Sequence, residues 1–191
     1  GMRTALETEL QFPREDPAEV LREALEDLDR LEKTIDDLLS IARRRDGGQT
    51  SLSLAELFAE LKAKWGRQFA AADRELSIDS GQGTPEVRAS RSMLIHALDV
   101  LLDNSLRHGG GRVELDLEVG LDSATISVSD EGEGFPPSMS LDSLFSPDTE
   151  TSQGLGLPLA RRLVETMGGR VSVRRSGPGP RIDIVLARAD R

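Results

Sequence analysis

The 191-residue sequence has no cysteine, only two histidines and few aromatic residues, and each absence narrows its possible functions. Without cysteine it has no disulfide framework and no thiolate metal site, which fits a reducing compartment. Two histidines are too few for a multi-histidine metal centre. Because aromatic residues make up only 3% of the chain, we expect a core of Leu, Val, Ile and Ala.

Positive charge and long apolar runs are also scarce. Lys and Arg number 24 against 34 Asp and Glu, and the net charge of −10 argues against a nucleic-acid-binding surface. No apolar run approaches the length that spans a bilayer, and no signal peptide is recognisable.

Residues 16–46 have the pattern of one long helix. Asp16 and Pro17 suit its first turn, and Gly47 suits its end. Apolar residues recur four and three positions apart, as in a helical bundle: Ala24, Leu28, Leu31, Ile35, Leu38 and Ala42. This face can pack on the chain's own domain or on a second copy. The short preceding segment 2–12 and the dense charge elsewhere on the helix favour a homodimeric four-helix bundle.

Residues 49–191 form a second predicted domain, with helices and strands mixed along the chain. Apolar residues at helical spacing start at Leu54 and continue to Trp65. Further helices are predicted over 90–107 and 155–167. Strands are predicted over 75–79, 86–89, 113–119, 124–128, 170–175 and 182–187. Strands with one apolar face, covered by helices, predict an α+β fold arranged as a two-layer sandwich.

Three motifs follow one another in this second domain. Asp99-Val100-Leu101-Leu102-Asp103-Asn104 ends a helix, Asp130-Glu131-Gly132-Glu133-Gly134 follows a strand, and Gly154-Leu155-Gly156-Leu157 opens a helix. In this order the motifs resemble the nucleotide-binding domain of sensor histidine kinases, in the ATPase superfamily shared with gyrase and heat-shock chaperones. The resemblance implies a histidine-kinase-type ATPase sandwich over 49–191. Before it, residues 2–48 would form a helical hairpin that is part of a dimeric bundle.

Asp130 is the candidate adenine contact. A carboxylate only accepts hydrogen bonds, so it can receive a proton from an exocyclic amino group. Gly132 and Gly134 would let the backbone turn with positive φ and approach a ring closely. A tight acidic turn would have the same residues, whereas in the resembled family the matching Asp contacts the adenine amino group.

Asn104 is the candidate metal ligand, because a carboxamide oxygen suits Mg²⁺. A helix-terminal Asn that caps the chain is the alternative. The resemblance implies ATP and Mg²⁺ as cofactors, with Arg107 on a phosphate and His108 near the sugar.

The Gly154–Leu157 motif is the candidate triphosphate site, since the free N–H groups and the dipole of a helix N-terminus favour anions. The preceding segment 135–153 is rich in Pro, Ser and Asp, which suits a lid over the nucleotide. Phe145 stands where the resembled family has a lid phenylalanine.

One departure concerns Val100. Members of the superfamily that hydrolyse ATP have a Glu four residues before the Asn as general base. Valine cannot take a proton, so direct hydrolysis lacks its base. Many kinases have Asn at this position as a further metal contact, and its absence puts tight Mg²⁺ binding in question.

The segment Met2-Arg3-Thr4-Ala5-Leu6 resembles the later part of the family's phosphoacceptor motif. In this register the phosphoacceptor histidine falls before Gly1, so this chain is expected not to phosphorylate itself. The resemblance implies a cytoplasmic catalytic core that passes phosphate to a histidine and then to a response regulator receiver domain. Any membrane anchor would lie in segments outside the chain.

Two alternatives remain at this stage. A nucleotide-gated interaction module that no longer phosphorylates is favoured by Val100 and by the missing acceptor. A serine kinase of the anti-sigma type shares the nucleotide site but lacks a long bundle helix, so residues 16–46 argue against it.

Overall fold

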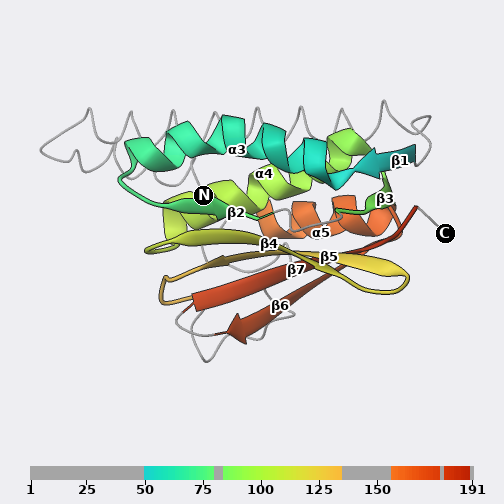
Figure 1. Ribbon diagram of the computed structural model, residues 1–191. Helices are drawn as coiled ribbons and strands as arrows, with labels where there is room; N and C mark the ends of the chain where they lie inside the picture. Colours follow the sequence, from blue (N-terminus) through green and yellow to red (C-terminus); the bar gives the residue numbers. More distant parts are fainter. Residues whose placement is uncertain (1–49, 80–83, 135–155, 177–178, 190–191) are drawn as a thin grey trace, which may run out of the picture. The chain divides into compact units, whose positions relative to one another are not determined.

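The computed structural model describes residues 50–79, 84–134, 156–176 and 179–189 (Figure 1). All of them lie in one compact unit, Gly48–Arg191. The predicted helix over 16–46, the lid with Phe145, and residues Gly154 and Leu155 lie outside the described residues.

The described residues form three helices and seven strands, which alternate along the chain. The helices are α3 (Leu54–Ala71), α4 (Arg91–His108) and α5 (Gly156–Thr166). The strands are β1 (Thr50–Ser53), β2 (Leu76–Ile78), β3 (Glu86–Ala89), β4 (Val113–Val119), β5 (Ser123–Asp130), β6 (Arg170–Ser176) and β7 (Gly179–Ala187).

Five strands form the main sheet in the order β2-β4-β5-β7-β6. Strand β2 is parallel to β4, and the other neighbours are antiparallel. Strands β1 and β3 pair separately beside the start of α3. The three helices cover one face of the main sheet, which gives the two-layer α+β sandwich expected from the sequence (Figure 1).

The core lies between these two layers because the strands alternate apolar and polar residues. On β5, Ala124, Ile126 and Val128 are buried against the helices, and Leu94 and Leu98 of α4 pack from the other layer. Thr125 and Ser127 point to the opposite, polar face of the sheet. This period-two pattern fixes the register, since a shift by one residue would turn the apolar side outward.

The structure confirms the predicted β4–β5 hairpin and places both short strands within one residue of prediction. Helix α5 ends at Thr166, one residue before the predicted end, and Gly168, the predicted stop, follows with a φ of +76°. Two predictions were incomplete. Strand β1 was not expected, because four residues show little periodicity, and β7 begins at Gly179 rather than 182. Among the described residues, no helix is long and apolar enough to cross a membrane.

Candidate functional site

Asp130, the last residue of β5, is held by backbone amides from two separate segments. Its Oδ1 accepts a hydrogen bond from the Gly132 N–H at 2.8 Å and from the Gly110 N–H at 3.3 Å. The first donor belongs to the motif after β5, and the second to the turn after α4. The carboxylate is therefore fixed in direction and not free in solvent.

Glycines surround Asp130 because its neighbours leave no room for a side chain. A Cβ on Gly109 would lie 2.6 Å from the Asp130 Cγ, and one on Gly132 would lie 2.7 Å from Oδ1. A Cβ on Gly179, the first residue of β7, would lie 1.9 Å from the Asp130 carbonyl oxygen. Three segments far apart in sequence therefore meet at this residue.

The two glycines of the Asp130 motif serve different purposes. Gly134 has a φ of +70°, the left-handed conformation that glycine adopts most easily. Gly132 was expected to share this feature, but among the described residues its φ is not one of the positive ones. That part of the prediction was wrong, and close approach to Asp130 is what requires glycine at position 132.

A pocket opens beside Asp130, between the end of α4 and the start of β7. The structure brings four of the predicted site residues together in its walls: Asn104, His108, Asp130 and Gly134. Pro180 and Ile182 also line the pocket, although no sequence pattern links them to the motifs. The lining residues are Asn104, Ser105, His108, Gly109, Asp130, Gly134, Pro180 and Ile182.

The two carboxylates closest to Asn104 in sequence are engaged elsewhere. Asp103 forms an ion pair with Arg107 at 3.1 Å on the surface of α4, and neither residue lines the pocket. Asp99 is buried and accepts hydrogen bonds from Lys64 Nζ at 2.6 Å and Trp65 Nε1 at 2.7 Å, which tie α4 to α3. The contact of Arg107 with a phosphate stays a prediction.

Val100 and Gly156 meet at the start of α5. Val100 is 8% exposed, and a Cβ on Gly156 would lie 3.2 Å from its Cγ1. Leu157, the next residue of the glycine motif, is buried in the core, and its predicted part in nucleotide binding stays a prediction. The residue that replaces the superfamily's general base therefore packs against the helix N-terminus predicted to bind phosphate.

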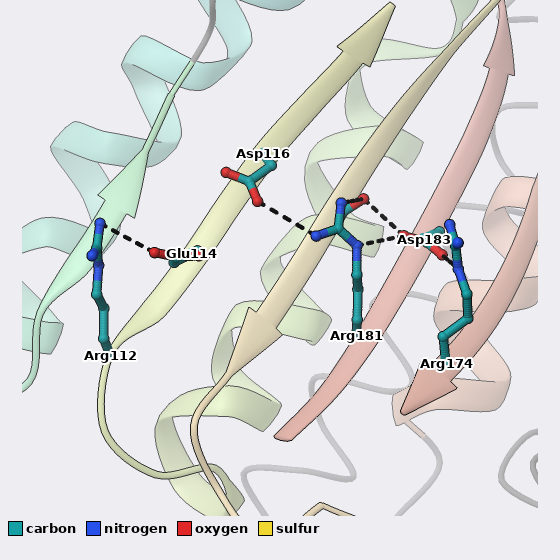
Figure 2. A network of polar contacts seen from close by, with 7 residues as sticks. Arg112, Glu114, Asp116, Arg174, Arg181 and Asp183 are labelled. Atoms are coloured by element: carbon teal, nitrogen blue, oxygen red, sulfur yellow. Dashed lines mark hydrogen bonds and ion pairs between the residues drawn. The ribbon is translucent and has the colours of Figure 1, made fainter. Parts of the chain in front are cut away.

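A second polar cluster lies on the face of the main sheet opposite the helices (Figure 2). Asp183 of β7 is 1% exposed and accepts hydrogen bonds from Arg174 at 2.6 Å, Ser127 at 2.8 Å and Arg181 at 3.2 Å. Burial alone would raise the pKa of Asp183, but these donors outweigh it and hold the pKa below its ordinary value. Arg181 also forms an ion pair with Asp116 at 3.6 Å, so the cluster joins four neighbouring strands of the sheet, β4, β5, β7 and β6.

Comparison with known proteins gives one family. Residues 89–190 match the model described as histidine kinase-, DNA gyrase B-, and HSP90-like ATPase. The chain is 31% identical to the alginate biosynthesis sensor protein KinB of Pseudomonas aeruginosa, over 97% of this chain and 34% of KinB. It therefore spans about a third of the length of this curated relative.

Solved structures show the same fold. The catalytic domain of histidine kinase ThkA superposes with a TM-score of 0.67 at 21% identity, over 73% of this chain and 97% of that one. ThkA in complex with response regulator protein TrrA gives a TM-score of 0.76 at 19% identity, over 100% of this chain and 60% of that one. Each neighbour contains the sandwich described above.

Proposed function

The chain belongs to the histidine kinase-, DNA gyrase B-, and HSP90-like ATPase family, and from this premise we propose that it is the ATP-binding catalytic core of a sensor histidine kinase. In the parent protein it would transfer the γ-phosphoryl group of ATP to a histidine, from which a response regulator receives it. The observation that carries the proposal is the pocket in which Asp130 and Asn104 stand together.

Asp130 supports adenine recognition through the direction of its hydrogen bonds. Among the described residues, the backbone N–H groups of Gly110 and Gly132 both donate to Asp130 Oδ1, which leaves Oδ2 to accept a hydrogen bond from a ligand. Adenine presents an amino group at the position where guanine presents a carbonyl oxygen. A fixed carboxylate therefore favours adenine and repels guanine.

The residues present fit a magnesium-nucleotide complex. Mg²⁺ commonly takes one or two protein oxygens, and completes its shell with phosphate oxygens and water. Asn104 supplies a neutral oxygen at the pocket wall, and the described residues contain no cluster of acidic or histidine side chains that would bind a metal without the nucleotide. When bound, the ion neutralises charge on the transferring phosphoryl group.

Val100 favours transfer to a protein acceptor over hydrolysis. A buried valine beside Gly156 offers no base to a water molecule near the phosphates. Positioning and charge neutralisation are then what the domain contributes, and the acceptor imidazole is the nucleophile. The same observation fits a second candidate function, a nucleotide-gated interaction module without phosphoryl transfer.

Adenine recognition is tested by titration calorimetry with ADP. Asp130→Asn replaces a carboxylate oxygen acceptor with an amide that can present an N–H donor to the adenine amino group. The polar groups left unsatisfied cost about 1–3 kcal/mol, or roughly a tenfold or greater loss of affinity. Asp116→Asn, the same change on the polar face of the sheet, is the matched control and should bind as the wild type does. Equal affinity of all three proteins would reject the site.

Radiolabelled ATP separates the two candidate functions. This chain should bind nucleotide and stay unlabelled, because His96 lies on α4 and His108 lines the pocket, neither in an acceptor sequence. Placing a histidine and an acidic residue ahead of Met2 should give an acid-labile phosphoryl adduct. Absence of that adduct despite bound nucleotide would favour the interaction module. A homodimer through residues 16–46 and a receiver-domain partner are further parts of this proposal.

A further inference from the structure

We propose that Arg74 is a positioning residue for the nucleotide site, acting on the turn of residues 109–112 that connects α4 to β4. The inference rests on the proposed ATP-binding function. Arg74 does not line the pocket. Its guanidinium instead binds carbonyl oxygens at both ends of the chain segment that carries His108, Gly109 and Gly110.

The end of α3 fixes the direction of Arg74. The chain turns at Asp73, whose φ is +54°, and the Arg74 N–H donates to the Phe69 carbonyl at 2.9 Å. This 6→1 hydrogen bond around a left-handed residue is a common helix ending. The guanidinium carbon then lies 5.7 Å from the centre of the buried Phe69 ring, a cation–π contact.

The guanidinium joins two points that are five or six residues apart. Its Nη1 donates to the Ser105 carbonyl and, at 3.1 Å, to the Leu106 carbonyl, both in the last turn of α4. Its Nε donates to the Gly111 carbonyl at 2.9 Å. The last carbonyls of a helix lack intrahelical partners and favour a cation, and the planar fork of arginine can address several of them at once.

The clamped segment is the one that holds Asp130. Gly110 donates its N–H to Asp130 Oδ1 at 3.3 Å and accepts at 2.9 Å from the N–H of Glu131. Gly110 therefore contacts the residue that reads the base and the residue after it. Because Arg74 fixes the segment before and after Gly110, it also fixes the direction of the Asp130 carboxylate.

The test compares Arg74→Met with Arg112→Met by calorimetric titration of ADP and GDP. Methionine keeps an unbranched stem over Phe69 and removes every donor. Arg112 is the matched control, because it carries the same charge and is the last residue of the same turn, yet its side chain pairs only with Glu75 and Glu114 among the described residues. A purely Coulombic effect on the nucleotide would appear in both variants.

We expect Arg74→Met to bind ADP about tenfold more weakly, in keeping with the loss of charged hydrogen bonds. The ratio of ADP to GDP affinity should fall too, because a misdirected Asp130 discriminates less. Arg112→Met should keep the wild-type affinity and ratio. A variant that is only partly folded loses affinity for both nucleotides equally, so the ratio separates positioning from stability.

Each outcome decides the question. If the wild type binds no nucleotide, the proposed function fails. If the wild type binds and Arg74→Met keeps either its affinity or its ADP-to-GDP ratio, the positioning role is overturned. Should Arg74→Met not fold, Arg74→Lys takes its place, since lysine keeps the charge but cannot bind both ends of the segment. A wild-type ratio in a folded Arg74→Lys would equally overturn the proposal.

Discussion

Gly109→Ala is a severe test of the site, because the substitution adds one methyl group at the point where α4 meets Asp130. Gly109 has φ −82° and ψ −178°, a conformation that alanine also adopts, so the backbone itself is not strained. The new Cβ would lie 2.6 Å from both the Asp130 Cγ and the Ser105 carbonyl oxygen. Ordinary contacts begin at 3.4 Å, so a shift of 0.8 Å is required.

Asp130 must make most of that shift. The Ser105 carbonyl belongs to the last turn of α4 and is held there by Arg74 and by the Gly109 N–H. Moving Asp130 away would lengthen its 2.8 Å hydrogen bond from Gly132 beyond bonding distance. Overpacking costs about 1–3 kcal/mol, and we expect nucleotide affinity to fall about tenfold to a hundredfold.

Calorimetry with ADP and thermal unfolding followed by Trp65 fluorescence measure the two effects. Gly66→Ala is the control, since nothing lies within 4 Å of a Cβ at that position in the middle of α3. Alanine there should stabilise the protein by about 0.5–1 kcal/mol, raise Tm by about 1–4 °C and leave ADP binding unchanged. Wild-type affinity and Tm in Gly109→Ala would refute the packing described around Asp130.

The remaining predictions concern other parts of the chain. Because the pKa of Asp183 lies below its ordinary value of 3.8, its charge stabilises the fold above that pH, and this contribution is lost as the pH falls below it. Asp183→Asn should therefore lower the free energy of unfolding by about 1–3 kcal/mol at neutral pH and flatten its decline in acid; an unchanged acid limb in urea melts would argue against this. Asp99→Asn should destabilise the protein by a similar amount and alter the emission of Trp65, whose indole N–H it bonds; an identical spectrum would contradict that contact. Leu28→Glu with Ile35→Glu should turn a dimer into a monomer in light scattering, and a monomeric wild type would exclude the bundle.

Local patterns in the sequence predict most of the helices and strands of the fold. Strict alternation over 113–119 and 124–128 predicts a hairpin, because each strand buries one face and the pattern has a period of two, and the structure has strands over Val113–Val119 and Ser123–Asp130. Glycine after the last apolar residue predicts the end of α5. What these patterns lack is any reference to a distant partner. The parallel pairing of β2 with β4 joins segments more than 35 residues apart, and no sequence pattern in either segment indicates the other as its partner.

The residues of the candidate site differ in the same way: some lie in sequence motifs and can be predicted, and others depend on distant contacts and cannot. Asp130, Asn104 and His108 are identifiable because motif and element coincide, and the structure brings them to one pocket. Arg74 is not identifiable, because a lone arginine after a helix looks like any solvated charge. Its role depends on hydrogen bonds to backbone carbonyl groups more than 30 residues away. Since every residue has a backbone carbonyl, the sequence does not indicate which of them Arg74 contacts. Pro180 and Ile182 reach the pocket only through the pairing of β7 with β5.

The meeting of three chain segments at Asp130 has a consequence for the order of biosynthesis. A chain grows from its N-terminus, and among the described strands β7, which supplies Pro180 and Ile182 to the pocket, is the last to emerge. Strand β7 also lies between β5 and β6, so the sheet has a gap until it arrives. A nascent chain that ends before β7 has the Asp130 carboxylate but only part of the pocket wall around it. Under the proposed function, nucleotide would bind only after β7 has joined the sheet, and bound nucleotide would then stabilise the closed sheet by mass action.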